Sequence, residues 1–523
     1  MFEDFNLKQK DKYHLIFIAV FSTILVAYYI QFNDRIGISC SDVYVYLLNA
    51  LYYTGTNIHA TENIYLSPLI CFLTSIIFKF GFVDKLAIYI ITGIFAIFGN
   101  IGCYLLFRKY FDELLSLTGT VIYSTCTLYL TWLANGTLDV PATGMIIWIA
   151  LFTIIAVKEN SKFYEYLIPL IILGFFTRYT VILTIPAFLL FYVYENGFKI
   201  NSKDLKHIKK GIIISVVMIL IILAILLIMG NGQFEAGFQL SRGIMGANGS
   251  ESNPAYNPNL SYYLVNLPNF ISNSHTVFDG NPVLENPTML SWAVIALMVV
   301  GAGFWLYDNK PQLERKHLLP AILILIAVVT FTRISSVITT LLVLIALYLI
   351  GKDSENQTGY FMLAWILSNA IYLSYYNVKV NRYILPVFPA LIFFILTAIN
   401  IIHTHVKINK KVIPIILIVL FMIQGFAFTY TFEPTNQYTS TEDISNYLIE
   451  HDPGYADKPI GVYNIRPYSW WLGGNVTGIP SGNQETIDSS NVTYYISNQK
   501  LDNLTNYTEI KNIEKLYLYE KSV

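Results

Sequence analysis

Two aspartates stand where a carboxylate could take a proton from a substrate. Asp42 is followed by Tyr44 and Tyr46, and Asp139 comes two residues before Pro141. A carboxylate within hydrogen-bond reach of a hydroxyl group can act as its general base. Each aspartate also has a structural interpretation, because tyrosines anchor chains at membrane surfaces and an aspartate before proline often caps a helix. Sequence spacing alone leaves both interpretations open.

Four basic residues complete the set of side chains that could do chemistry: Lys85, Arg178, Lys379 and Arg382. The two arginines lie in apolar surroundings, where a cation is costly unless it is paired or functional. A guanidinium binds phosphate oxygens through two parallel hydrogen bonds, which suits a phosphate-bearing lipid beside an acid–base group. The alternative for a lysine such as Lys85 is a side chain that extends to the lipid headgroups.

The composition indicates that these residues belong to a membrane protein. Of the 523 residues, 55% are hydrophobic and only 13% are charged, whereas soluble chains carry about 25% charged residues. The mean hydropathy is +0.52. A formal net charge of −1 gives no indication of a nucleic-acid partner. The four cysteines lack metal-binding spacing, and His403 and His405 lie in a basic loop expected in the cytoplasm.

Long apolar segments predict an all-α polytopic membrane protein with about 13 transmembrane helices, since roughly 20 residues cross the hydrocarbon core. The segments are 14–31, 86–107, 114–133, 141–157, 163–177, 179–194, 211–230, 290–307, 318–332, 334–350, 360–377, 383–400 and 412–430. Their connections alternate between basic ones, such as those with Arg108, Lys158 and Lys407, and ones nearly free of cations. The positive-inside rule makes the basic set cytoplasmic, together with residues 1–13.

Two apolar segments do not fit a simple crossing. Residues 64–81 would reverse the topology after them if they crossed, so we predict a helix on or in the outer leaflet. Residues 163–194 would form a helix of about 48 Å, too long for the bilayer. Basic residues on both sides of 163–194 favour a hairpin of two short helices with Arg178 at its outer tip.

Three regions are then expected outside the cytoplasm: the loops 32–85 and 231–289, and the tail 431–523. The membrane domain covers 14–430. In the tail, 442–450 is typical of a helix, and 459–465 and 492–496 are typical of strands. The tail therefore predicts a small α/β extracytoplasmic domain, with Trp470 and Trp471 in its core.

Six short motifs occur in order within residues 14–400. They are Asp42 followed by Tyr46 and Ala50, Tyr65-Leu66-Ser67-Pro68-Leu69 before a helix ending in Phe80-Gly81, Arg108-Lys109-Tyr110-Phe111, Asp139-Val140-Pro141, Gly174-Phe175-Phe176-Thr177-Arg178-Tyr179, and Arg382-Tyr383-Ile384-Leu385-Pro386. In this order they resemble the membrane glycosyltransferases of the GT-C fold, in particular the protein-mannosyltransferase and aminoarabinose-transferase branch. Arg178 stands where that family usually has lysine, and the motifs do not cover the tail.

The resemblance implies sugar transfer from a polyprenyl (dolichyl-type) phosphate donor to a protein, glycan or lipid acceptor outside the cell membrane. It makes Asp42 the general base of an inverting displacement. Asp139 would orient the acceptor or hold a divalent cation such as Mg²⁺ or Mn²⁺, and the four basic residues above would bind the donor phosphate. The tyrosines of these motifs are expected to line the substrate pocket: Tyr44, Tyr46, Tyr65, Tyr179 and Tyr383.

Two other functions are compatible with a polytopic chain. An oligosaccharyltransferase shares the fold, but its Trp-Trp-Asp signature is not met by Trp470-Trp471-Leu472. A transporter or lipid flippase would place ionisable groups near the middle of the membrane, whereas the charged residues here gather at the outer surface.

Overall fold

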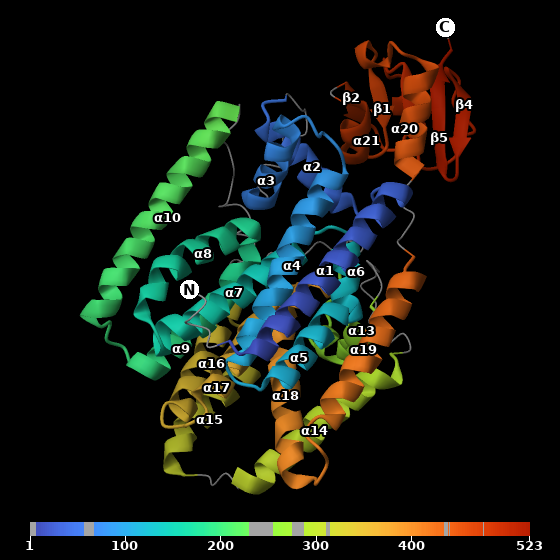
Figure 1. The fold of residues 1–523 in the computed structure, drawn as a ribbon. Helices are drawn as coiled ribbons and strands as arrows, with labels where there is room; N and C mark the ends of the chain where they lie inside the picture. Colours follow the sequence, from blue (N-terminus) through green and yellow to red (C-terminus); the bar gives the residue numbers. More distant parts are fainter. Residues whose placement is uncertain are drawn as a thin grey trace.

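A bundle of helices forms most of the molecule, and a small sheet-containing domain follows it (Figure 1). The computed structural model describes residues 7–56, 67–229, 255–274, 287–309, 314–433, 438, 440–473 and 475–522. The first half contains α1 (Gln9–Ile36), α2 (Ser41–Tyr53), α3 (Pro68–Lys79), α4 (Leu86–Arg108), α5 (Glu113–Thr125), α6 (Thr127–Ala134), α7 (Asp139–Lys158), α8 (Tyr164–Thr177), η4 (Tyr179–Thr184), α9 (Ile185–Asn196) and α10 (Ser202–Met229). The second half contains α12 (Tyr262–Val265), α13 (Leu267–Ser272), α14 (Met289–Asn309), α15 (Leu318–Val329), α16 (Ser336–Gly351), α17 (Gln357–Tyr375), η6 (Asn381–Val387), α18 (Phe388–His405) and α19 (Val412–Thr431).

The predicted membrane segments coincide with helices, but fewer helices are long enough to cross a membrane. Within the described residues, eight combine the needed length and apolar composition, and the bent pair α5 and α6 makes a ninth if counted as one span. Helices α8, α15 and α16 have 14, 12 and 16 residues. At 1.5 Å per residue they reach only about 18–24 Å. The helical class is therefore confirmed, whereas the number of about 13 spans is not.

Two short helices, α2 and α3, lie at the end of the bundle beside the C-terminal domain (Figure 1). Helix α3 has 12 residues, so its length of about 18 Å is too short for a crossing, as predicted for 64–81. The chain turns away after α3 at Gly81, whose φ of 95° suits glycine. Residues 43–50 of α2 are all buried, which explains why no helical periodicity in the sequence predicts α2.

The predicted helix 114–133 is broken in the structure. Helices α5 and α6 meet at Cys126 with a bend of 51°. Thr127 accepts a hydrogen bond from the backbone N–H of Ser274 at 2.8 Å, and Thr131 donates to the Ser274 carbonyl at 2.7 Å. These bonds hold Ser274, from the segment 231–289, against the bend. At the bend, side-chain hydrogen bonds take the place of the backbone hydrogen bonds that the break in the helix interrupts.

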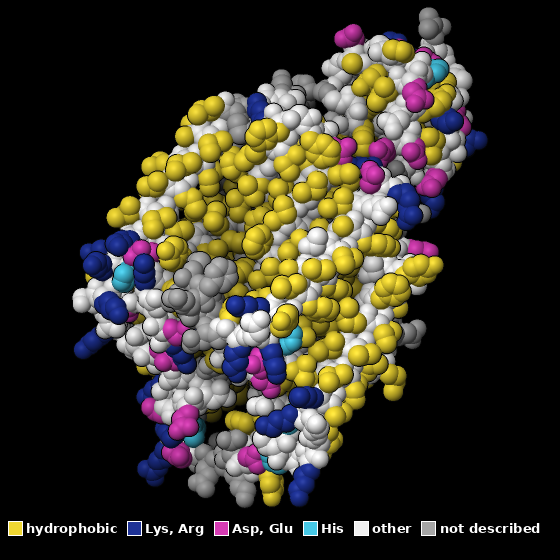
Figure 2. Space-filling view, viewed as in Figure 1, with side chains coloured by type: hydrophobic (Ala, Val, Ile, Leu, Met, Phe, Trp, Pro, Cys, Tyr) yellow, Lys and Arg dark blue, Asp and Glu magenta, His cyan; other side chains and the backbone are white. Residues whose placement is uncertain are grey.

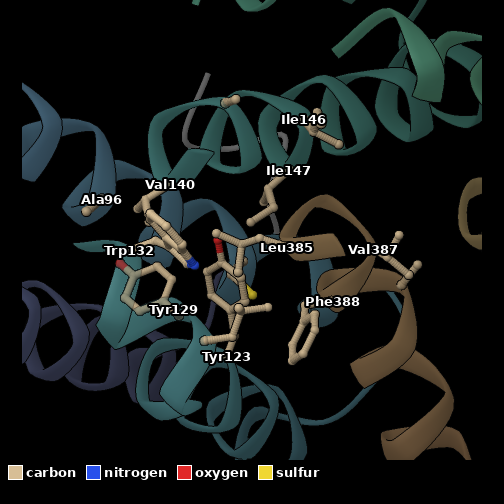
Figure 3. Close-up of a cluster of buried hydrophobic side chains, with 14 of the residues drawn as sticks. Ala96, Tyr123, Tyr129, Trp132, Val140, Ile146, Ile147, Leu385, Val387 and Phe388 are labelled. Atoms are coloured by element: carbon tan, nitrogen blue, oxygen red, sulfur yellow. The ribbon is translucent and has the colours of Figure 1, made fainter. Parts of the chain in front are cut away.

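A core of interlocking side chains holds α6, α7 and η6 together (Figure 3). Trp132, Tyr129, Ile147, Leu385 and Phe388 are each at most 2% exposed and point toward one another in this close-up. Dense packing of this kind leaves side chains little freedom to move. Helix α7 and η6, which carry two of the charged residues described below, Asp139 and Arg382, are therefore held rigidly.

The C-terminal domain is α/β, as predicted. Its elements are α20 (Ser440–His451), β1 (Ile460–Val462), α21 (Ile465–Leu472), β2 (Val476–Gly478), α22 (Gln484–Asp488), β3 (Tyr494–Ser497), β4 (Tyr507–Ile513) and β5 (Leu516–Lys521). The strands form a mixed sheet in the order β2-β1-β3-β5-β4. Strand β1 pairs in parallel with β2 and β3, and β5 pairs antiparallel with β3 and β4. The predicted strand 459–465 ends earlier, because α21 begins at Ile465.

The charges sort to two ends of the bundle. Helix α4 runs from Leu86 to Arg108, where Arg108 donates to the buried Asp11 at 2.6 Å. Helix α7 runs from Asp139 to Lys158, so its two ends also lie at opposite sides of the bundle. Figure 2 shows a broad apolar surface between charged side chains near the lower end and on the C-terminal domain. An apolar band between two polar ends is what a bundle needs in order to span a bilayer.

Candidate active site

Asp42 lies in the first turn of α2, and its carboxylate meets an arginine from the far end of the sequence. Oδ2 of Asp42 is 2.6 Å from Nη2 of Arg382, which donates the hydrogen bond. The Asp42 side chain remains 32% exposed. No hydrogen bond to its other oxygen, Oδ1, occurs among the described residues. One oxygen is thus held in place, and the other is open to a ligand.

Arg382, at the start of η6, is the centre of the site. It is only 7% exposed, and its guanidinium lies over the rings of Trp132 at 5.0 Å and Tyr383 at 5.6 Å. Its Nε is 3.6 Å from Oδ2 of Asp139, which is too long for a hydrogen bond. Among the described residues, Nε and Nη1 have no hydrogen-bond partner. Buried donors without partners are rare and costly, so these two suit an anionic ligand.

Asp139 and Arg178 form the second ion pair of the site. Nη1 of Arg178 donates to Oδ2 of Asp139 at 2.9 Å, and the Asp139 side chain is 2% exposed. Helix α7 has Leu138 at its N-cap position, so the helix-cap interpretation of Asp139 is wrong. Helix α8 ends at Thr177 and Arg178 itself is extended, which confirms the predicted break in the hairpin at that residue.

We call Asp42, Arg382, Asp139 and Arg178 the charged cluster. Burial by itself would raise the pKa of Asp42. The charge and hydrogen bond of Arg382, then the charges of Arg178 and Arg466, more than offset burial and hold the pKa of Asp42 below its ordinary value of 3.8. Asp42 is therefore a carboxylate at neutral pH, which is the form that can accept a proton.

Three of the five tyrosines predicted for the substrate pocket lie next to the charged cluster or to the elements that carry it. The Tyr383 ring lies 5.6 Å from the guanidinium groups of both Arg178 and Arg382. Tyr46 is buried one turn after Asp42, and burial, followed by the charge of Asp42, raises its pKa. Tyr179 donates its backbone N–H to Oγ of Ser67 at 3.1 Å, which ties the hairpin to the start of α3.

The other two tyrosines are not placed in the cluster. The Tyr44 hydroxyl bonds to Oγ1 of Thr441 at 2.8 Å and accepts from Nε1 of Trp471 at 3.2 Å. Tyr44 thus contacts the C-terminal domain, and its role in a substrate pocket stays a prediction. Trp470 stacks on Phe78 of α3 at 5.9 Å and packs against α2, so its predicted place in the core of the tail is wrong. Trp471 packs against the buried core of the C-terminal domain, as predicted, and also contacts α2 through Tyr44. Tyr65 lies outside the described residues.

Both lysines predicted for the phosphate site are engaged elsewhere. Lys85 is paired with Glu442 of the C-terminal domain at 2.6 Å and lies 5.7 Å from the Trp471 ring. Lys379 donates to the carbonyl oxygens of Leu373 and Ser374 at 2.6 and 3.0 Å, at the end of α17. Burial lowers the pKa of Lys379 to about 8. In this structure the arginines, not the lysines, face the aspartates.

The charged cluster does not fit a metal ion in this arrangement. Oδ2 of Asp139, the candidate ligand, accepts from Arg178 and faces Arg382. In the part of the chain that the structure describes, no three His, Cys, Asp or Glu residues are grouped to hold a metal. We therefore derive no step through a metal.

Two supporting residues of the site are not predicted from the sequence. Nε1 of Trp132 donates to Oδ1 of Asn381 at 2.9 Å, and the Asn381 amide donates to Oγ of Ser274 at 3.1 Å. These bonds hold the residue before Arg382 and the ring on which Arg382 lies. Asn381 adjoins the Arg-Tyr-x-Leu-Pro motif and could have been included, whereas nothing in the sequence distinguishes Trp132.

Comparison with solved structures identifies the class of fold. The chain is similar to ArnT from Cupriavidus metallidurans bound to undecaprenyl phosphate, with a TM-score of 0.58, 10% identity, and coverage of 96% of this chain and 97% of that one. The apo state of that ArnT gives a TM-score of 0.59 at 9% identity, with the same coverage. A weaker likeness, with a TM-score of 0.44 and 12% identity, is to the Archaeoglobus fulgidus oligosaccharyltransferase, covering 92% of this chain and 68% of that one. The chain therefore has the GT-C fold of membrane glycosyltransferases.

A family model narrows the class. Residues 66–226 match the model described as dolichyl-phosphate-mannose-protein mannosyltransferase. The match includes Asp139 and Arg178 and ends before Arg382. No curated protein sequence matches the chain significantly. The family match and the fold confirm the resemblance predicted from the motifs, and they indicate a multi-pass membrane glycosyltransferase of the GT-C type, similar to ArnT and to protein mannosyltransferases.

Proposed function

We propose that the protein transfers a sugar from a polyprenyl-phosphate donor to a hydroxyl group of an acceptor on the outer face of the cell membrane. The observation that carries the proposal is the geometry of Arg382. This buried guanidinium holds Asp42 with one N–H group, and its two other nitrogens have no hydrogen-bond partner among the described residues. It can therefore bind a phosphate next to the carboxylate that activates the acceptor.

Arg382 and Arg178 bind the donor phosphate in this proposal. Nucleotide sugars are confined to the cytoplasm, so an enzyme at the outer face needs a donor delivered by the membrane. The phosphate gains negative charge as its bond to the sugar breaks, and fixed guanidinium groups in a dry site stabilise that charge. Two names support the choice of donor: the matching family model refers to dolichyl-phosphate-mannose, and the ArnT structure contains undecaprenyl phosphate.

Asp42 acts as the general base. The acceptor hydroxyl attacks the anomeric carbon of the sugar and passes its proton to Asp42, whose Oδ1 is open to such a ligand. The bond from the anomeric carbon to the phosphate oxygen breaks, and polyprenyl phosphate leaves with the electron pair. A single displacement inverts the anomeric centre and needs only this one base. Asp139 orients Arg178 through its ion pair.

Purified protein in lipid nanodiscs, mixed with a panel of polyprenyl-phosphate sugars and membrane extract as the source of acceptor, tests the proposal. One donor should lose its sugar to an extracted acceptor with inversion, and Asp42→Asn should abolish the transfer. Arg333→Gln is the control variant, because Arg333 is exposed and makes no ion pair or hydrogen bond with the charged cluster among the described residues. Movement of intact donor across a bilayer with no cleavage of any panel member would instead support a lipid flippase.

A further inference from the structure

The C-terminal domain is seated on α2, the helix that carries the proposed base. Thr441 and Trp471 both bond to the Tyr44 hydroxyl, two residues after Asp42. The ion pair of Lys85 with Glu442 joins the same domain to the start of α4. Contacts from α20 and α21 thus hold the C-terminal domain against α2, and Figure 1 shows α21 beside this helix.

Arg466 is the residue of this domain whose contacts the proposed function leaves unexplained. It is the only arginine of the tail 431–523, and it lies in the first turn of α21, the helix that also carries Trp471. Its side chain is half-buried. Among the residues that the structure describes, it has no hydrogen bond or ion pair. A half-buried guanidinium without a hydrogen bond is unusual, because the water that its N–H groups lose on burial is not replaced.

The balance of charges in the site suggests a ligand for Arg466. The two carboxylates of the charged cluster are matched by the guanidinium groups of Arg382 and Arg178. Arg466 lies one helical turn before Trp470, whose ring packs against α2 and α3, and its charge contributes to the lowered pKa of Asp42. It adds one positive charge that the cluster does not neutralise. An excess positive charge in a partly desolvated site favours an anion.

We propose that Arg466 binds an anionic group, a phosphate or a carboxylate, on the acceptor. The inference rests on the proposed function and adds a substrate class to it: an acceptor with a negative charge close to the hydroxyl that receives the sugar. Arg466 comes from the C-terminal domain, which contacts α2 through Thr441 and Trp471. Arg382 and Arg178 come from the bundle, where a lipid-linked donor arrives. The two sets of cations thus hold two different substrates.

A first test needs no turnover and uses phenylglyoxal, a reagent for arginine, on the full chain in nanodiscs. Glycerol 3-phosphate is the anionic probe and glycerol is its neutral match, with labelled positions assigned by peptide mass spectrometry. Glycerol 3-phosphate should slow labelling of Arg466 severalfold, whereas glycerol should not. Equal labelling of Arg466 with and without glycerol 3-phosphate would overturn the proposal.

A second test separates the acceptor anion from the donor phosphate. Arg466→Gln should weaken binding of radiolabelled glycerol 3-phosphate about 10- to 100-fold, as expected for loss of a charge-assisted hydrogen bond. The same variant should leave the affinity for undecaprenyl phosphate unchanged. Lys500→Gln, at an exposed tail lysine, is the matched control and should change neither affinity.

The outcomes of the second test distinguish this inference from the proposed function. If Arg466→Gln weakened binding of undecaprenyl phosphate, Arg466 would belong to the donor site and the acceptor assignment would be wrong. If the wild-type chain bound glycerol 3-phosphate through Arg466 but did not bind undecaprenyl phosphate, the proposed donor would be wrong while the anion site would stand.

Discussion

Arg382 connects both halves of the proposed chemistry. Its Nη2 holds Asp42, and its remaining nitrogens have no hydrogen-bond partner in the part of the chain that the structure describes, so they suit a phosphate. The rings of Trp132 and Tyr383 fix the plane of the guanidinium, since cation–π contacts add directional attraction in a desolvated site. The orientation of Arg382 is therefore set before any substrate binds, and pre-organised charges of this kind lower the barrier of group transfer.

The proposed base can be tested by an isosteric change. Asp42→Asn keeps the size of the side chain and one hydrogen bond to Arg382 but cannot take a proton. We expect kcat to fall about 10²- to 10⁴-fold, while the affinity for undecaprenyl phosphate stays within a few-fold. Initial rates and lipid-binding titrations measure the two effects. A variant with near-normal turnover would return Asp42 to the role of a membrane-surface residue and make Asp139 the leading base.

The phosphate site can be tested by conserving charge but not shape. In Arg382→Lys a single ammonium group replaces the planar guanidinium and cannot hold Asp42 and a phosphate from separate nitrogens. We expect a loss of about 1.5–3 kcal/mol in donor binding or in transition-state stabilisation. Arg178→Lys should have a smaller effect, because that side chain faces Asp139. Unchanged kinetic constants in both variants would reject the phosphate site.

The ion pair also predicts a pH dependence. The pKa of Asp42 is lowered in the folded protein, so the pair is fully formed above the ordinary pKa of 3.8 and is lost as the pH falls through the lower value. In Arg382→Gln burial remains without its main offset, and the pKa of Asp42 should rise above 3.8. Labelling of Asp42 by dicyclohexylcarbodiimide, which reacts with protonated carboxyl groups, should extend to higher pH in the variant. Identical labelling profiles would contradict the assignment.

At the scale of elements, short helices set the positions of the charged residues. Helix α2 presents Asp42, the break between α8 and η4 presents Arg178, and η6 presents Arg382. Each residue lies where a helix begins or ends, so its side chain can leave the bundle without interrupting a hydrogen-bonded ladder. Because these residues lie at helix ends, predicting which segments cross the membrane does not by itself locate the site.

The contact of the C-terminal domain with the bundle can be measured through its ion pair. The Lys85 and Glu442 side chains are 8% and 23% exposed. Lys85→Met and Glu442→Gln should each weaken docking of the domain by about 1–3 kcal/mol, because each leaves one partly buried group unpaired. The double variant should lose less than the sum of the two. Denaturant titration followed by tryptophan fluorescence, which is sensitive to the contact of Trp470 with Phe78, measures the docking of the domain. Strictly additive losses of docking free energy would show that Lys85 and Glu442 do not interact.

At the scale of the whole molecule, the apolar band between two charged ends is the main determinant of how the chain sits in a membrane (Figure 2). The charged cluster and the C-terminal domain share one end, and the pair of Arg108 with Asp11 lies at the other. The positive-inside rule predicts that the end with Arg108 is cytoplasmic. The proposed reaction then takes place on the opposite, outer face.

Cysteine labelling tests this orientation directly. All four native cysteines are buried, so they give little background with a membrane-impermeant maleimide. In intact cells, Val83→Cys, at a residue 55% exposed, should be labelled, and Lys109→Cys should be labelled only after the membrane is opened. The reverse pattern would place the charged cluster in the cytoplasm and exclude the proposed delivery of the donor.

Local patterns in the sequence were enough to predict the class of the protein and the charged residues of its candidate site. Apolar segments and the distribution of lysine and arginine are local properties, and the high free energy of placing a charge in lipid makes them decisive. They predicted the helical bundle and the α/β tail, and with the order of motifs they led to Asp42, Asp139, Arg178 and Arg382. The number of about 13 crossings stays a prediction, since apolar composition does not report where a helix breaks.

Which of these residues contact one another becomes clear from the folded structure alone. Asp42 and Arg382 are 340 positions apart, and no periodicity relates residues across such a distance. The structure also moved Lys85 into the domain contact, turned Lys379 toward the end of α17, and brought Trp132 beneath Arg382. The physical reason is that a charge near a membrane must find a partner or a ligand, and the path of the folded chain determines which one is within reach.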